Sequence, residues 1–196
     1  QKASILTYVI YLVARPVTQL YSTPEKSPIT SWAYSILGQI YVVLPLALLG
    51  VWGYKSDYQL FMNTEYLLMA LFIFVWTNDT GAYIVGCTLG KHRLFERISP
   101  KKSWEGFFGG LAFCIILASL ANHIIPGMLS TAQWIGMGIL TSIFSTWGDL
   151  CESLLKRTAG VKDSGKILPG HGGILDRFDS ELIASPVIFI YLTFVL

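Results

Sequence analysis

The chain has 196 residues, of which 53% are hydrophobic and only 13% are charged, and its formal net charge is +2. Soluble domains carry about 25% charged residues, so this composition argues against a soluble globular protein and indicates a helical membrane protein. The small net charge, without a basic stripe, argues against a nucleic-acid-binding protein.

Apolar segments joined by polar connections follow one another along the chain. The first, residues 4–14, is shorter than the roughly 20 residues that cross a bilayer, and we expect it to end or kink at Arg15-Pro16. Longer runs predict spans over residues 31–54, 65–89, 104–125 and 133–155, and from residue 182 onward. We therefore expect an all-α, polytopic transmembrane bundle of about six spans.

One acidic residue lies inside the predicted span over residues 65–89. Asp79 follows Asn78 in a segment that is otherwise mostly apolar. An ionisable side chain is costly inside a membrane, so such residues commonly mark functional sites. The alternative is that Asp79 caps a break between two shorter helices.

The span over residues 104–125 carries signals for its start and its packing. Ser103 is expected to cap the helix, and Glu105 lies in the first turn, where the helix dipole favours an acid. Gly106 and Gly110 have the spacing that allows two membrane helices to approach closely.

Two charged loops, over residues 90–102 and 156–179, flank a pair of spans that turns at Pro126. Both loops must therefore face the same side of the membrane, and their excess of lysine and arginine predicts the cytoplasmic side. Asp79 and Asp149 then lie in the cytoplasmic halves of their spans. The sequence thus predicts one polar site on that side.

Lys101 and Lys102 end the first of these loops. One interpretation is that they only set the membrane topology. The other is that they bind an anionic substrate beside a helix N-terminus. Their spacing does not distinguish these two roles.

The densest cluster of polar, charged and glycine residues covers residues 145–179. Asp149, Glu152, Ser153 and Lys156 share one face of a predicted helix. Because that helix begins in an apolar segment, we expect this face to line a polar cavity.

Further polar groups follow this helix. Asp176 and Asp179 come after a PGHGG turn, and together with Asp149 they suit Mg²⁺, which prefers oxygen ligands. His171, in the turn, either binds a metal or moves a proton, or it only shapes the turn. Phosphates would meet the nearby cations and glycines, namely Lys156, Arg157, Lys162, Lys166, Arg177, Gly170, Gly172 and Gly173.

The residues alone therefore predict a membrane enzyme for a metal-bound, phosphate-bearing substrate, with a lipid as co-substrate. The rival class is an ion-coupled transporter, in which a broken helix at Asp79 would hold an ion or a proton. The absence of an obvious internal repeat in the sequence argues against the transporter.

Three stretches resemble the phosphatidate cytidylyltransferases, also called CDP-diacylglycerol synthases. The long signature runs from SLLKR at residues 153–157 through KD at 162–163, HGG at 171–173 and DR at 176–177 to Asp179. SPKKSWEG at residues 99–106 and NDTGAY at residues 78–83 also resemble that family. The two short motifs also resemble those of related CTP-dependent lipid kinases, so the long signature favours the cytidylyltransferases.

The resemblance implies transfer of a cytidylyl group from CTP to phosphatidate, which gives CDP-diacylglycerol and pyrophosphate with Mg²⁺ as cofactor. The cofactors could include a second cation. The alternative to this function is a related CTP-dependent lipid kinase, or a cytidylyltransferase that acts on another lipid phosphate. The resemblance also implies a homodimer in the bacterial inner membrane. Residues 65–196 would then be the catalytic transmembrane domain, preceded by N-terminal transmembrane helices over residues 1–64 whose N-terminus we expect to be incomplete, because the chain begins with Gln1.

On this basis each polar group receives an expected role. The catalytic residues are Asp149, Lys156, Arg157, His171 and Asp176. The substrate-binding residues are Asp79, Lys101, Lys102, Ser153, Lys162, Gly172, Gly173 and Arg177. The metal ligands are Asp149, Asp176 and Asp179.

Overall fold

The structure is a computed structural model that describes residues 2–21, 27–53, 64–167 and 172–196. It divides into two compact units, Gln1–Leu44 and Pro45–Leu196. Every residue assigned to the site lies in the second unit.

The first unit is almost entirely helical in its described part. It contains α1 (Lys2–Leu20), α2 (Pro28–Gly38) and a π-helical turn, η1 (Gln39–Val43). Of the expected end or kink at Pro16, the end is wrong, because α1 continues to Leu20. Prolines are tolerated within membrane helices because neighbouring groups satisfy the freed backbone. Arg15 donates to the hydroxyl of Ser31 at 2.8 Å and so joins α1 to α2.

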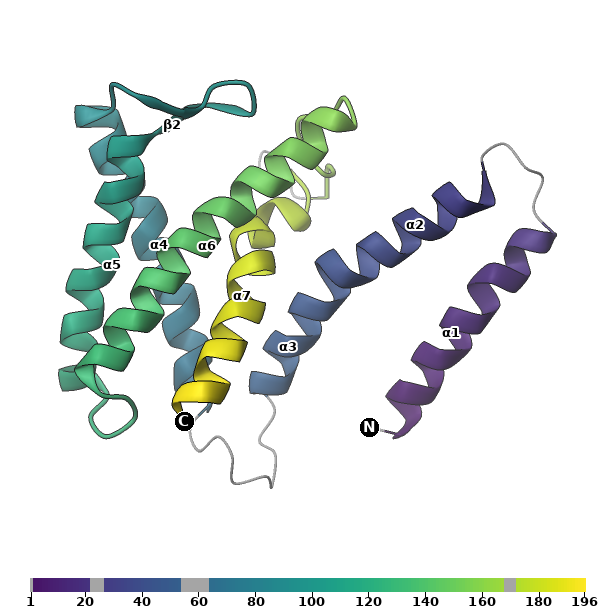
Figure 1. Cartoon of the computed structure of the whole chain (residues 1–196), viewed down its shortest axis with the longest axis horizontal. Helices are drawn as coiled ribbons and strands as arrows, with labels where there is room; N and C mark the ends of the chain where they lie inside the picture. Colours follow the sequence, from purple (N-terminus) through teal and green to yellow (C-terminus); the bar gives the residue numbers. More distant parts are fainter. Residues whose placement is uncertain (1, 22–26, 54–63, 168–171) are drawn as a thin grey trace. The chain divides into compact units, whose positions relative to one another are not determined.

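The second unit is a helical bundle with one small hairpin (Figure 1). Its elements are α3 (Leu44–Gly53), α4 (Thr64–Leu89), β1 (Arg93–Phe95), β2 (Ser99–Ser103), α5 (Trp104–Ile124), α6 (Thr131–Thr158) and α7 (Leu175–Val195). The fully buried core joins four of the helices through Phe74, Cys114, Trp134 and Ile188. The hairpin, the end of α6 and the start of α7 lie at one end of this unit, at the top of Figure 1.

The basic loop before α5 is more ordered than the sequence predicts. Its strands pair antiparallel, with Phe95 opposite Ser99. Glu105 closes the base of the hairpin, since its carboxylate accepts from the backbone N–H of Lys91 and contacts Nδ1 of His92 at 2.6 Å. The Ser103 cap is confirmed, because its hydroxyl accepts from the backbone N–H of Gly106.

Four helices in the described residues are long and apolar enough to cross a membrane: Pro28–Gly50, Glu65–Leu89, Trp104–Ile124 and Leu175–Val195. This agrees with the predicted all-α membrane fold, to which the structure adds the β-hairpin. The number of about six spans stays a prediction. Two boundaries also differ: α6 continues to Thr158 and α7 begins at Leu175, so the loop between them is shorter than predicted.

Candidate functional site

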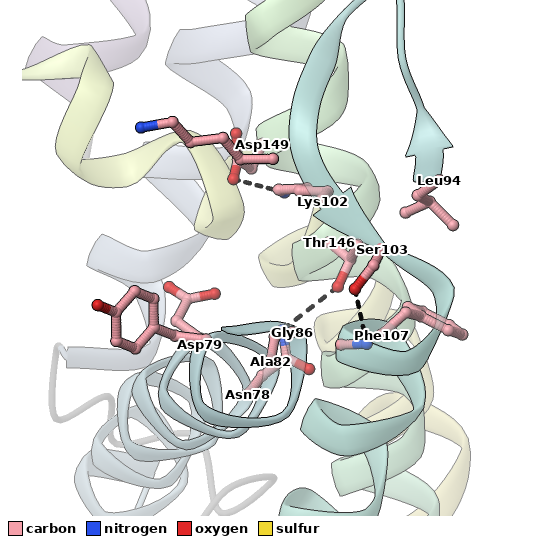
Figure 2. A pocket seen from close by; sticks show the side chains of 13 residues that line it. Asn78, Asp79, Ala82, Gly86, Leu94, Lys102, Ser103, Phe107, Thr146 and Asp149 are labelled. Atoms are coloured by element: carbon pink, nitrogen blue, oxygen red, sulfur yellow. Dashed lines mark hydrogen bonds and ion pairs between the residues drawn. The ribbon is translucent and has the colours of Figure 1, made fainter. Parts of the chain in front are cut away.

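A cavity of about 260 Å³ opens between α4, β2, α5 and α6 (Figure 2). Its polar lining comes from residues that the sequence singled out, with apolar side chains around them. The lining residues are Asn78, Asp79, Ala82, Tyr83, Gly86, Leu94, Lys101, Lys102, Ser103, Gly106, Phe107, Thr146 and Asp149. The cavity thus combines carboxylates, ammonium groups and an apolar wall, which suits an amphipathic anion.

Asp79 reaches this cavity from the middle of an unbroken helix. Because α4 runs from Thr64 to Leu89, the interpretation of Asp79 as a cap at a helix break is wrong. The broken helix that the transporter hypothesis required is likewise not found in this described segment.

Glycines on α5 bring α4 close enough to form the cavity wall. A β-carbon at residue 110 would lie 2.5 Å from Oδ1 of Asn78, and one at residue 106 would lie 2.9 Å from the carbonyl oxygen of Ala82. Larger residues would hold the helices apart. The predicted small-residue contact of Gly106 and Gly110 is therefore confirmed.

Asn78 joins α4 to α6. Its Oδ1 accepts a hydrogen bond from the hydroxyl of Ser142 at 2.6 Å. Its Nδ2 donates to the hydroxyls of Ser145 and Thr146 at 3.2 and 3.3 Å. Only 2% of Asn78 is exposed, so these bonds form inside the bundle.

Asp149 faces the cavity from α6 and is paired with a lysine of the hairpin. Its Oδ2 lies 2.5 Å from Nζ of Lys102, and its Oδ1 accepts from the hydroxyl of Ser153 at 3.2 Å. Figure 2 shows this pair and the Asp79 carboxylate on opposite sides of the cavity. Both partners keep about a quarter to a third of their side chains exposed, so a ligand can reach them.

Asp179 is brought to Asp149 by a tight crossing of α6 and α7. A β-carbon at Gly148 would lie 2.6 Å from the carbonyl oxygen of Asp179 and 2.9 Å from that of Ser180. Asp179 interacts electrostatically with Asp149, and Asp79 interacts with both. Three carboxylates from three helices thus lie within electrostatic range of one another.

Asp176, by contrast, holds the loop between α6 and α7. Its oxygens accept from the backbone N–H and the hydroxyl of Ser164 at 2.9 and 2.8 Å, and from the N–H of Gly173 at 2.7 Å. Nζ of Lys156 lies 2.8 Å from the Asp176 carboxylate and 2.6 Å from that of the buried Glu152. Lys156 and Asp176 therefore stabilise the return of the chain from α6 to α7.

The predicted metal ligands do not form one group. Within the described residues no cluster of three or more His, Cys, Asp or Glu side chains is arranged to hold a metal ion. Asp149 and Asp179 are neighbours across the helix crossing, whereas the Asp176 carboxylate is occupied by Lys156, Ser164 and Gly173. Which of the three binds a metal stays a prediction.

The remaining predicted residues do not share one location in the structure. Lys101 lines the cavity, and Gly172 has a φ of 82°, a conformation that favours glycine. Arg157, Lys162 and Arg177 are exposed. His171 lies outside the described residues.

Sequence reasoning missed one acid. Glu181 on α7 is only 3% exposed and interacts electrostatically with Asp179 and Asp79. The available signal was a carboxylate two residues after Asp179, at the start of an apolar segment. Glu181 lies just past the end of the signature at Asp179, so the motif assigned it no role.

Comparison with known proteins adds a family and several relatives. The sequence model of the family described as "Cytidylyltransferase family" matches residues 1–195. The chain is similar to proteins named phosphatidate cytidylyltransferase from Staphylococcus aureus (strain COL), with 41% identity over 160 residues, and Staphylococcus haemolyticus (strain JCSC1435), with 41% identity over 159 residues. A protein of the same name from Staphylococcus epidermidis (strain ATCC 12228 / FDA PCI 1200) is 40% identical over 159 residues.

Each of these matches covers 81% of this chain and 61% of the relative. The chain therefore spans less than two thirds of the length of the curated relatives that it matches.

Proposed function

The chain belongs to the cytidylyltransferase family, and we propose that it transfers a cytidylyl group from CTP to phosphatidate, giving CDP-diacylglycerol and pyrophosphate. The observation that carries the proposal is the cavity in which Asp79 faces the Lys102–Asp149 ion pair. A nucleotide triphosphate and a lipid phosphate both need cations, and a metal-bound triphosphate also needs carboxylates.

The reaction forms one bond and breaks one bond at the α-phosphorus of CTP. An oxygen of the lipid phosphate attacks this phosphorus, and the bond to the bridging oxygen of the β-phosphate breaks, so that pyrophosphate leaves. A phosphate monoester is nucleophilic near neutral pH, so no dedicated general base is required. Lys101 and Lys102 would stabilise the negative charge that builds on the phosphoryl oxygens.

Two carboxylates fit a Mg²⁺ ion better than three in this site. Mg²⁺ commonly uses one or two carboxylates and completes its shell with water and substrate phosphates. Asp149 and Asp179, adjacent across the α6–α7 crossing, would hold it, and Asp176 could join only after losing a present partner. When bound, the ion would neutralise triphosphate charge and make the pyrophosphate a better leaving group.

The placement of the site suits a water-soluble and a membrane-bound substrate. The cavity lies below the hairpin, whose Arg93, Arg97, Lys101 and Lys102 favour the cytoplasmic side of a bacterial inner membrane. CTP would approach from the water, while the lipid phosphate stays at headgroup level. We also propose a homodimer, which light scattering in detergent would test.

The test uses the full chain in detergent with phosphatidate and CTP labelled at one phosphate. Label from the α-phosphate should appear in the lipid, whereas label from the γ-phosphate should not. Transfer of the γ-label would instead identify a lipid kinase. Absence of transfer from either position would contradict both enzyme hypotheses.

Asp149→Asn tests the site itself. The amide keeps the size of the side chain but removes the charge that faces Lys102 and the metal, so transfer should fall by at least about 100-fold. The variant should still insert and purify normally. Turnover near that of the unmodified chain at saturating Mg²⁺ would contradict the assignment of Asp149 to the site.

A further inference from the structure

We propose that Asn78 is the positioning residue that sets the distance between Asp79 and Asp149 across the cavity, an inference that rests on the proposed function. Asn78 directly precedes Asp79 on α4. Two of its partners, Ser145 and Thr146, lie one helical turn before Asp149 on α6. The amide therefore joins the two helices at the level at which they present their carboxylates.

The hydrogen bonds around Asn78 have fixed directions. The hydroxyls of Ser145 and Thr146 donate to the carbonyl oxygen of Ser142, at 3.2 and 2.9 Å, so their lone pairs are available to accept. The hydroxyl of Ser142 instead donates to Oδ1 of Asn78. Only a side chain with one acceptor and two donors matches this set, and an amide has that arrangement.

A third helix holds the amide in place from the other side. Gly110 of α5 leaves no room for a β-carbon, which would lie 2.5 Å from Oδ1 and 2.7 Å from the carbonyl oxygen of Asn78. Asn78 is thus enclosed between the backbone of α5 and three hydroxyls of α6. A side chain so confined fixes the position of α4 along its axis and its rotation about that axis. Together these determine where the Asp79 carboxylate lies.

The energetic scale separates positioning from folding. Side-chain hydrogen bonds between membrane helices each contribute little to stability. The bundle also buries a large apolar core, so loss of three such bonds should leave it folded. Misplacement of a reacting group by about 1 Å, however, can cost on the order of 100-fold in rate.

Asn78→Asp and Asn78→Leu test the inference in the full chain. The aspartate has the same shape but lacks the two N–H donors, and the leucine lacks every polar atom. We expect kcat for α-label transfer to fall at least about tenfold in both, with KM for CTP changed less than about threefold. A small loss of thermal stability without a fall in kcat would show a merely structural role and overturn the proposal.

A distance measurement makes the test independent of turnover. Cys87 on α4 and Cys151 on α6 are exposed, whereas Cys114 is buried, so spin labels on the two exposed thiols report the spacing of these helices. In Asn78→Leu the distance distribution should shift or broaden. An unchanged distribution would overturn the proposal even if kcat fell.

Thr141→Val is the matched control. Thr141 lies on α6, the helix that carries the partners of Asn78, and its hydroxyl is buried. No hydrogen-bond partner is found for that hydroxyl within the described part of the chain. Its loss should change neither kcat nor the label distance. If the unmodified chain transfers no label, the proposed function fails, while the spin-label distances still test whether Asn78 sets the helix spacing.

Discussion

Replacing Gly148 with alanine should separate α7 from α6 at the level of the site. The added β-carbon would lie 2.6 Å from the carbonyl oxygen of Asp179, whereas ordinary contacts begin at 3.4 Å. The obstructing atoms are backbone, so no side-chain rotation relieves the contact. We expect α7 to move by about 0.8 Å, which takes Asp179 away from Asp149.

The expected cost has two parts. Overpacking of this kind destabilises a protein by about 1–3 kcal/mol. A displacement near 1 Å at reacting groups can lower the rate on the order of 100-fold. We therefore expect Gly148→Ala to reduce α-label transfer by about 10- to 100-fold in protein that is still folded, as judged by thermal unfolding in detergent.

Gly136→Ala is the control on the same pair of helices. Its β-carbon would lie 2.5 Å from the hydroxyl oxygen of Tyr191, far along α6 from the site. It should lower stability but leave the rate of the folded protein close to that of the unmodified chain. Equal rates for Gly148→Ala and the unmodified chain would refute the reasoning, as would equal rate losses at both glycines.

Two further predictions concern the lysines of the site. Lys156→Met should lower the free energy of unfolding by about 3 kcal/mol, because it leaves Glu152 and Asp176 without their cation. Thermal unfolding measures this loss, and the double variant that also carries Glu152→Gln should regain part of it. If Lys156→Met were as stable as the unmodified chain, the buried ion pair would be contradicted. Lys102→Met should tighten binding of Mn²⁺ about five- to tenfold in the absence of substrates, because the substitution removes the ammonium group that competes with the metal for Asp149. Electron paramagnetic resonance of free Mn²⁺ measures this affinity, and an unchanged or weaker affinity would argue against Asp149 as a ligand.

Several features of this fold follow from local sequence. The long apolar runs predicted α4, α5 and the core of α6, because burial in a bilayer requires uninterrupted helices. Ser103 and Gly110 were also interpreted correctly, since a cap and a close helix contact depend on few neighbours. The β-hairpin was missed because strand pairing joins residues whose individual preferences are weak.

The sequence by itself determined the class of protein, the family and most of the residues around the cavity. It could not separate the surroundings of Asp176 and Asp179, which lie three residues apart in one motif. Only the tertiary structure did so: Gly148 places Asp179 beside Asp149, while Lys156 and Ser164 hold Asp176 in the loop. The reason is physical, because the direction of a carboxylate depends on partners from other helices, and spacing along one helix does not encode them.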